Sequence, residues 1–209
     1  MRSFDIETTG LSFTSDTITA ASVYSLEENI SQTFVFSKGD SKEEFLALLD
    51  SAPSLCAFNG ARFDIPFLEI SWNLSPHRTL QWRLKLFDLY ELSVQLFGKG
   101  FSLNQLLKAN QIPSKTASGT EAIQFYQARD WPSLASYCLQ DTIKTYQVSS
   151  LPRVLLPLPA SQGGPLWLFQ DIPCPSLSSL GCHAHRRISW VPFPSEEHPP
   201  SHEDILEDP

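Results

Sequence analysis

Two acidic residues near the N-terminus stand two positions apart in the segment Phe4-Asp5-Ile6-Glu7, where apolar and acidic side chains alternate. Alternation with a period of two predicts a β-strand, whose successive side chains point to opposite faces. Asp5 and Glu7 should therefore lie side by side on one face, while Phe4 and Ile6 enter the core on the other. An exposed polar strand face is the structural alternative, but two carboxylates at that spacing repel each other, which favours a chemical role.

Two later segments carry the same kind of chemistry. In AFNGARFDIPFL, Asp64 follows a predicted strand-to-helix turn and stands between Phe63 and Ile65, where a lone carboxylate is costly to bury. In YCLQDTIKT, Tyr137 and Asp141 are four residues apart on a predicted helix, which places them on one face and one turn from each other. A half-buried core position is the structural alternative for Tyr137.

Together these segments supply four carboxylates and one phenol beside strongly apolar neighbours: Asp5, Glu7, Asp64, Asp141 and Tyr137. Such a cluster is stable only if cations neutralise it, and carboxylates with few His or Cys ligands suit Mg²⁺ or Mn²⁺ rather than zinc. Two such ions about 3.5 to 4 Å apart clamp the attacking and leaving oxygens in phosphodiester hydrolysis. Tyr137, with a free pKa of about 10, is a poor base at neutral pH, so we expect it to orient the attacking water by hydrogen bonding.

The three segments FDIETTGL, AFNGARFDIPFL and YCLQDTIKT resemble, in this order, the three motifs of the DEDD superfamily of 3′-to-5′ exonucleases, which have an RNase H-like fold. The second and third segments are most similar to the proofreading exonuclease domains of family-B DNA polymerases and their stand-alone relatives. The resemblance extends from residue 3 to about residue 149. One motif alone would be a weak signal, whereas three in order are a strong one.

The resemblance implies a role for each matching residue of the three motifs. It makes Asp5, Glu7, Asp64 and Asp141 the ligands of two metal ions. It makes Tyr137 the residue that positions the water. The other branch of the superfamily has a histidine five residues before the last aspartate, and here that position is occupied by Ser136. The chain therefore resembles the tyrosine branch.

For substrate binding, the resemblance implies two contact regions. The pocket for the terminal nucleotide is lined by Thr8, Thr9, Gly10 and Leu11, the last of which packs against the terminal base. Asn59 and Phe63 contact the penultimate nucleotide, and stacking on an aromatic ring, worth about 1 to 3 kcal/mol per base, accepts any sequence. A simple turn is the structural alternative for Asn59-Gly60, and we accept it for Gly60.

The elements that must position these residues follow from the periodicity of the sequence. Strands are predicted at residues 2–8, 16–26, 31–37, 54–59 and 83–89. Helices are predicted after a capping box that begins at Ser41 and at residues 63–74, 91–98, 102–111, 120–129 and 131–150. Asp88 is predicted to be a helix N-cap. Strands first and helices interleaved later indicate an α/β domain with a mixed sheet flanked by helices. The resemblance implies the three-layer, RNase H-like form of this class.

The composition changes near residue 150. Of the 16 prolines, 5 precede this point and 11 follow it, and the later segment has no helical or alternating periodicity. We predict an exonuclease domain at residues 1–150 and a Pro- and Ser-rich, largely irregular tail at residues 151–209, with a disordered end. The tail contains metal-ligand residue types without the paired spacing of a zinc finger: Cys174, Cys182, His183 and His185. An unstructured linker is the expected alternative to a zinc site.

The formal net charge of -8 does not decide the binding partner. Residues 1–150 carry 12 Lys and Arg against 16 Asp and Glu, so cations bound by several of the acids would leave a neutral or positive working surface. The sequence has neither a run of about 18 apolar residues nor an apolar signal region, so we expect no membrane span and no secretion. The four cysteines lack the spacing of a disulfide framework, which favours an intracellular protein.

These observations predict a two-metal-ion 3′-to-5′ exonuclease that uses Mg²⁺ or Mn²⁺ to release nucleoside 5′-monophosphates from single-stranded 3′ ends. DNA is favoured over RNA only because the motifs resemble those of polymerases. A proofreading role would require a polymerase or repair partner in trans, since no polymerase part is recognised in the sequence. The alternative is a catalytically weak nuclease-fold module that binds nucleic-acid 3′ ends or a protein partner. The complete set of acids argues against this alternative.

Overall fold

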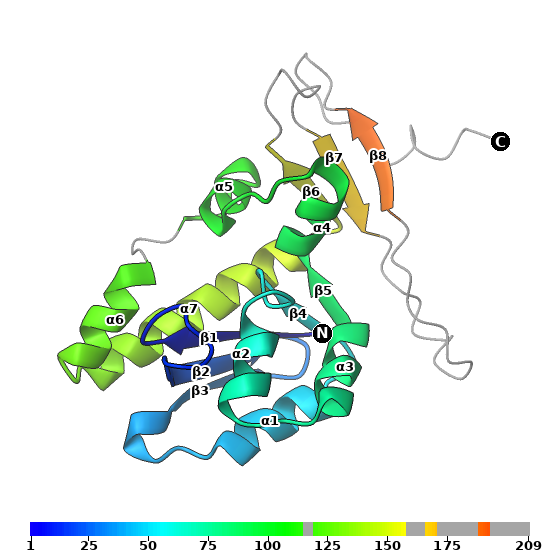
Figure 1. Cartoon of the computed structure of the whole chain (residues 1–209). Coiled ribbons are helices and arrows are strands. Elements are labelled where there is room, and N and C mark those ends of the chain that lie inside the picture. The colour runs from blue at the N-terminus through cyan, green and yellow to red at the C-terminus, as the bar shows by residue number, and fades with distance from the viewer. Residues whose placement is uncertain (115–118, 158–165, 171–187, 193–209) are drawn as a thin grey trace. The chain divides into compact units, whose positions relative to one another are not determined.

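The structure is a computed structural model that describes residues 1–114, 119–157, 166–170 and 188–192 (Figure 1). The chain divides into two compact units, Met1–Ser150 and Leu151–Pro209. The first unit contains every residue of the predicted exonuclease site. None of the helices in the described ranges has the length and hydrophobicity needed to cross a membrane.

The first unit is built on a five-stranded mixed sheet in the order β3-β2-β1-β4-β5. Its strands are β1 (Arg2–Thr8), β2 (Ile18–Ser25), β3 (Ile30–Val35), β4 (Leu55–Ala57) and β5 (Leu86–Asp88). β1, β2 and β3 pair antiparallel, as expected for an opening meander, whereas β4 pairs parallel to β1 and β5 pairs parallel to β4. β1 is therefore the central strand, with an antiparallel neighbour on one side and a parallel neighbour on the other.

Seven α-helices and one short 3-10 helix accompany this sheet in the described part of the first unit. They are η1 (Phe36–Lys38), α1 (Lys42–Ser51), α2 (Asp64–Ser71), α3 (Pro76–Leu84), α4 (Leu89–Phe97), α5 (Leu103–Ala109), α6 (Gly119–Gln127) and α7 (Trp131–Ser149). Side-chain caps begin several of them, because Ser41 accepts a hydrogen bond from the Glu44 amide and Asp130 accepts one from the Ser133 amide. The predicted cap at Ser41 is confirmed.

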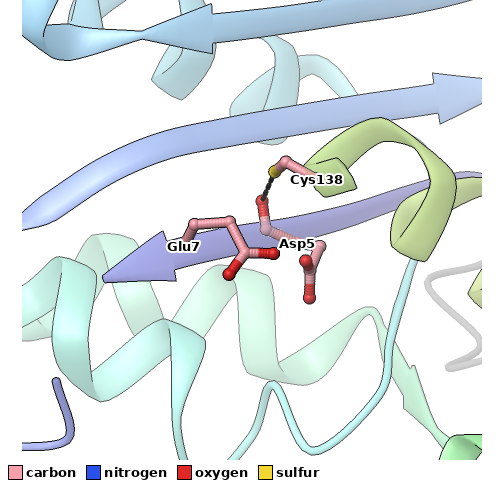
Figure 2. A group of neighbouring side chains, drawn as sticks. All are labelled: Asp5, Glu7 and Cys138. Carbon is pink, nitrogen blue, oxygen red and sulfur yellow. Dashed lines mark hydrogen bonds between the residues drawn. The ribbon is translucent and has the colours of Figure 1, made fainter. Parts of the chain in front are cut away.

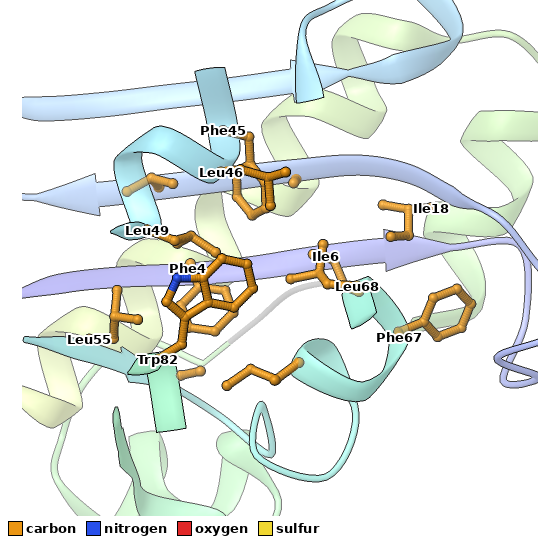
Figure 3. Close-up of a cluster of buried hydrophobic side chains, with 14 of the residues drawn as sticks. Phe4, Ile6, Ile18, Phe45, Leu46, Leu49, Leu55, Phe67, Leu68 and Trp82 are labelled. Atoms are coloured by element: carbon orange, nitrogen blue, oxygen red, sulfur yellow. The ribbon is translucent and has the colours of Figure 1, made fainter. Parts of the chain in front are cut away.

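The main core lies between one face of the sheet and helices α1, α2 and α3 (Figure 3). It is formed by large side chains that are almost inaccessible to solvent, including Phe4, Phe45, Leu49, Leu55, Leu68 and Trp82. A second cluster covers the opposite face, where Ala20 of β2 and Val35 of β3 pack against residues of α6 and α7. Helices therefore cover both faces, which confirms the predicted three-layer α/β architecture.

One α-helix of the first unit was not predicted, namely α3, and its last residues, Arg83 and Leu84, had been assigned to the predicted strand 83–89, which is shorter in the structure. Its N-terminus carries a clear signal, because Ser75 caps the helix by accepting a hydrogen bond from the Arg78 amide and Pro76 occupies the first turn. Its body is mostly polar and exposed, and only Thr79 and Trp82 are buried. Apolar periodicity was therefore too sparse to identify the helix.

The described residues of the second unit form a three-stranded antiparallel sheet in the order β6-β7-β8. Its strands are β6 (Arg153–Leu156), β7 (Leu166–Gln170) and β8 (Ile188–Pro192). A largely irregular chain was predicted for residues 151–209, because this segment has no helical or alternating periodicity. The predicted disordered end of the tail and the metal-ligand residues Cys174, Cys182, His183 and His185 lie outside the described residues.

Candidate active site

The two faces of β1 carry different chemistry. Phe4 and Ile6 belong to the main core on one face. Asp5 and Glu7 extend from the strand near Cys138 of α7, whose Sγ points at the Asp5 carbonyl oxygen in Figure 2. The predicted alternation along β1 is confirmed.

The ligand atoms of Asp5, Glu7 and Cys138 all lie within 4.8 Å of one another. Glu7 is only 9% exposed, although it is a carboxylate on the central strand. Charged groups are rarely buried to this degree without compensation. Ligand atoms at this separation can contact one cation together, since a single ion binds side-chain atoms that are a few ångströms apart.

Cys138 is a member of this cluster that the sequence analysis did not assign. Its Sγ donates to the Asp5 carbonyl oxygen at 3.7 Å and lies 3.2 Å from Ser22 Oγ. Burial, and then the charges of Asp5 and Glu7, raise the pKa of the Cys138 thiol well above its usual range. The thiol is therefore protonated at neutral pH and leaves the carboxylates as the anionic donors. A signal existed in the sequence, because Cys138 precedes Asp141 by three residues and so shares its helix face.

One turn of α7 brings Tyr137 and Asp141 together beside the same face of β1. Asp141 is 6% exposed, and Tyr137 is half-buried. Burial raises the pKa of Tyr137, and the charges of Asp141, Glu7 and Asp5 raise it further. The phenol is therefore neutral at physiological pH and can donate a hydrogen bond. Three predicted metal ligands thus raise the pKa of one hydroxyl group, which indicates that they share one electrostatic environment.

Asp64 reaches this region from the first residue of α2. It is 3% exposed, and its Oδ1 accepts a hydrogen bond of 3.1 Å from the Ile6 amide, between Asp5 and Glu7. Burial raises the pKa of Asp64 to about 7; the Ile6 hydrogen bond acts in the opposite direction, and the charge of Asp88 adds to the increase. A nearby cation would favour the ionised form, as it does for any buried carboxylate.

The structure brings all four predicted metal ligands to one segment of β1, but by different routes. Asp5 and Glu7 lie on the strand and belong to the close cluster. Asp141 is linked to them through Tyr137, and Asp64 through the Ile6 amide. Asp64 and Asp141 lie outside the 4.8 Å group in the described residues. The donor chemistry, carboxylates with a protonated thiol, fits a hard divalent cation such as Mg²⁺ or Mn²⁺.

The turn that precedes α2 positions Asn59. Asn59 has a φ of 64°, in the left-handed region that asparagine tolerates, and its carbonyl oxygen accepts a hydrogen bond from the Phe63 amide at 2.9 Å. Its own amide donates to Asp88 Oδ1 at 2.9 Å. Asp88 also caps α4, as predicted, by accepting from the amides of Tyr90 and Glu91. The turn accounts for the backbone of Asn59, and its contact with a nucleotide stays a prediction.

The predicted pocket residues are Thr8, the last residue of β1, and Thr9 to Leu11 in the loop between β1 and β2. Leu11 is 83% exposed, the highest value among the large hydrophobic side chains of the described residues. Phe13 fixes the loop to α2, with its ring centroid 6.1 Å from that of Phe63 and 5.5 Å from that of Phe67. Thr8 Oγ1 donates to the Gly10 carbonyl oxygen at 2.6 Å. The loop thus exposes Leu11 to solvent, two residues before the anchor Phe13.

The sequence model of the RNase_H superfamily matches residues 3–151 of this chain. No curated protein sequence matches it. Among solved structures, the chain is similar to the family B DNA polymerase from the hyperthermophilic archaeon Pyrobaculum calidifontis, with 17% sequence identity and a TM-score of 0.56. That match covers 71% of this chain and 24% of the polymerase.

Two further similarities have lower TM-scores. The apo form of a nuclease matches with a TM-score of 0.46 and 17% identity, covering 70% of this chain and 68% of the nuclease. The zinc-bound complex of E. coli exonuclease I with single-stranded DNA matches with a TM-score of 0.43 and 16% identity, covering 84% of this chain and 52% of the exonuclease. The present chain therefore spans about a quarter of the polymerase and about half of exonuclease I.

Proposed function

This chain belongs to the RNase_H superfamily, and we propose that it is a metal-dependent 3′-to-5′ exonuclease that shortens single-stranded 3′ ends and releases nucleoside 5′-monophosphates. One observation carries the proposal: the ligand atoms of Asp5 and Glu7 on the central strand and of Cys138 on α7 lie within 4.8 Å of one another. Burial and the charges of Asp141, Glu7 and Asp5 raise the pKa of the neighbouring Tyr137, in agreement with this cluster. The similarity to solved structures supports the fold of such an enzyme. The proposed activity is inferred from the acidic side chains of β1, α2 and α7.

Four carboxylates would hold two divalent cations, Mg²⁺ or Mn²⁺: Asp5, Glu7, Asp64 and Asp141. When bound, such ions supply a nucleophilic water at neutral pH and offset the charge that develops on the leaving oxygen. Asp5 and Glu7 offer their oxygens from the rigid centre of the sheet, which limits their movement. Asp141 and Asp64 approach from two different helices, so the site closes only when the first unit is folded.

Tyr137 has the task of orienting the attacking water. Because burial and then the surrounding carboxylates raise its pKa, the phenol keeps its proton and donates a hydrogen bond instead of acting as a base. A fixed donor beside the acids restricts the water to one orientation, which lowers the entropic part of the barrier. Tyr137 is thus assigned a positioning function.

The strand end would be bound by the exposed Leu11 and by Phe63. Leu11 is available to pack against the terminal base, and Phe63 is part of an aromatic group with Phe13 and Phe67 that can present a ring to the next base. Such contacts are tolerant of sequence. DNA is favoured over RNA because the motifs resemble those of polymerases. We assign the protein to the interior of the cell. A proofreading role there would require a polymerase or repair protein in trans.

The experiment that tests this proposal is a product-ladder assay. Single-stranded DNA and RNA of one sequence, labelled at the 5′ end, are incubated with wild type, Asp5→Ala and the surface control Glu43→Ala in Mg²⁺ or Mn²⁺. We expect a ladder that shortens by one nucleotide at a time, at least a thousandfold slower in Asp5→Ala, equivalent to about 4 kcal/mol, and unchanged in Glu43→Ala. Metal-dependent binding of either strand without shortening would overturn the exonuclease and favour a binding module.

A second readout tests the metal site without turnover. Mn²⁺ at about 100 times its dissociation constant should raise the melting temperature of the wild type by about 5 °C or more, since it binds the folded state only. Asp5→Ala should lose this shift, and Glu43→Ala should retain it. Equal shifts in all three proteins would exclude Asp5 as a ligand.

A further inference from the structure

The loop between β1 and β2 contains a carboxylate to which the proposed function gives no task, that of Asp16. Its Oδ2 accepts a hydrogen bond of 2.8 Å from the Ser12 amide, and its Oδ1 accepts one of 3.0 Å from Thr9 Oγ1. The Asp16 amide in turn donates to the Ser12 carbonyl oxygen at 3.0 Å. A single side chain therefore joins the beginning, the middle and the end of the loop.

Thr9 extends this connection to the following strand. Its Oγ1 accepts a hydrogen bond from the Thr17 amide at 3.0 Å, and its own amide donates to the Thr17 carbonyl oxygen at 3.0 Å. These hydrogen bonds thus join the two ends of the loop, directly after β1 and directly before β2. The Thr9 hydroxyl group can donate to Asp16 while it accepts from Thr17, so each partner fixes the direction of the other hydrogen bond.

Gly10 is the second partner of Asp16. A Cβ atom added at Gly10 would lie 2.5 Å from Asp16 Oδ2 and 2.8 Å from its Cγ, closer than real contacts allow. Gly10 is not among the glycines with a positive φ, so the backbone there is one that other residues adopt. A larger residue at this position would therefore have to displace the Asp16 carboxylate from its hydrogen bonds to Ser12 and Thr9.

This arrangement surrounds the exposed Leu11. Leu11 lies between Gly10, which packs against the carboxylate, and Ser12, which donates to it. Phe13 then anchors the far side of the loop on Phe63 and Phe67. Aromatic packing fixes where the loop sits, whereas the carboxylate fixes the course of the backbone through Leu11.

We propose that Asp16 is a positioning residue that shapes the segment Thr8 to Leu11 for the end of the bound strand, with Gly10 as its steric partner. The inference rests on the proposed function, because it assigns Asp16 to the site for the terminal nucleotide. Asp16 need not touch the nucleotide itself. It acts through Leu11 and the backbone on either side, so its loss should weaken substrate binding more than the chemical step.

Steady-state kinetics on a short single-stranded oligonucleotide test this assignment. Asp16→Ala should raise KM about tenfold and leave kcat within about twofold, because two hydrogen bonds to a charged acceptor are lost away from the reacting atoms. Asp16→Asn retains an acceptor for one of the two donors and should recover most of the KM. The matched control is Asp40→Ala, which removes a carboxylate from another loop, where it accepts from the Val35 amide; its KM should be unchanged.

A double-mutant cycle tests the contact between Asp16 and Gly10. Gly10→Ala should raise KM about as much as Asp16→Ala, because the added methyl group displaces the carboxylate. In the Asp16→Ala background the same change should have less than a twofold effect, since the clash has been removed. Independent, multiplicative effects would overturn the pairing.

Hydrogen exchange at the Ser12 amide separates failure of this inference from failure of the proposed function. Faster exchange in Asp16→Ala than in wild type, together with the increased KM, supports the assignment. Faster exchange with an unchanged KM overturns the positioning role and leaves the exonuclease intact. If the wild type shortens no strand, the exonuclease itself is wrong, and the substrate role of Asp16 is excluded with it, whatever the exchange rate of Ser12.

Discussion

On one face of β1, Phe4 and Ile6 are buried among the aromatic and aliphatic side chains of α1, α2 and α3. On the other face, Asp5 and Glu7 lie close to the buried thiol of Cys138 on α7. The first face contributes apolar burial, roughly 25 cal/mol per Å² removed from water. The second concentrates negative charge, which costs free energy until a cation is bound. Adjacent residues of one strand therefore have opposite effects on stability.

The rigidity of the central strand explains why it can hold two acids side by side. β1 is paired on both sides and fixed from behind by the main core, so its backbone cannot relax to separate Asp5 from Glu7. A hydrogen bond also joins α7 to β2, because Ser22 Oγ donates to the Cys138 carbonyl oxygen at 3.0 Å. Apolar packing thus provides the rigidity with which the opposite face holds like charges together.

The largest expected effect comes from breaking the apolar face. Phe4→Ala should lower the free energy of unfolding by about 3 to 5 kcal/mol, because it removes a fully buried ring and leaves a cavity. Glu7→Gln, three positions along the same strand, should leave the stability unchanged or raise it in metal-free buffer. Urea unfolding of both variants in EDTA measures the difference.

Leu26→Ala is the matched control for loss of an apolar side chain. Leu26 is 70% exposed, so its removal should change the stability by less than about 0.5 kcal/mol. A loss of stability in Glu7→Gln equal to that in Phe4→Ala would contradict the comparison. It would mean that the acidic face is part of the structural core.

The pKa of Asp64, which is hydrogen-bonded to β1, can be compared with the pKa of Asp50 elsewhere in the unit. Burial raises the pKa of Asp64 to about 7. Burial alone would raise the pKa of Asp50 as well, but hydrogen bonds from Arg78 and Trp82 outweigh it and lower that pKa. Ionised Asp50 therefore stabilises the fold above the unfolded pKa, and this stability is lost as the pH falls below about 4.

Asp64 should show the opposite pH dependence in metal-free protein. Its carboxyl group ionises near pH 4 in the unfolded chain but near pH 7 in the folded one, so it lowers the stability progressively as the pH rises between these values. Relative to wild type, Asp64→Asn should gain about 2 kcal/mol in free energy of unfolding between pH 5 and 7, with the gain measured by urea titration in EDTA. Asp50→Asn should gain nothing in this range, and a flat difference for Asp64→Asn would show that its carboxyl group is not desolvated.

The sequence was sufficient to predict the elements of the first unit whose signals are local. Period-two runs identified the opening strands, and the side-chain caps at Ser41 and Asp88 marked helix starts. Regular spacing predicted the pairing of Asp5 with Glu7 on one strand face and of Tyr137 with Asp141 on one helix turn, whereas only the resemblance joined these motifs in one site. The sparse apolar pattern of α3 and the short strands of the second unit gave too little periodicity.

Contacts between distant residues could not be predicted from spacing. The hydrogen bond from the Ile6 amide to Asp64 joins residues 58 positions apart. The tie between Asp88 and the Asn59 amide likewise depends on β4 and β5 being neighbours. The close approach of Asp16 to Gly10 requires knowledge of the loop backbone, since neither residue type alone indicates it.

The smallest expected effect comes from removing one oxygen atom of α7 that lies beside the acidic face of β1. Tyr137→Phe should lower kcat about tenfold, equivalent to about 1.4 kcal/mol, with little change in KM, because only the orientation of the water is lost. Single-turnover rates on 5′-labelled DNA measure the chemical step directly. The raised pKa of Tyr137 further predicts that the ratio of the two rates stays constant from pH 6 to 9, since the phenol does not ionise in this range.

Tyr146→Phe is the control for loss of a phenol from the same helix. Burial raises the pKa of Tyr146 to about 12, followed by its hydrogen bond to Glu27, so this hydroxyl group is also neutral, but it belongs to a contact with the β2–β3 turn. The substitution should leave the single-turnover rate unchanged. Equal rates for wild type and Tyr137→Phe would mean that the acids alone orient the water, and the acidic face of β1 would then need no donor from α7 for its chemistry.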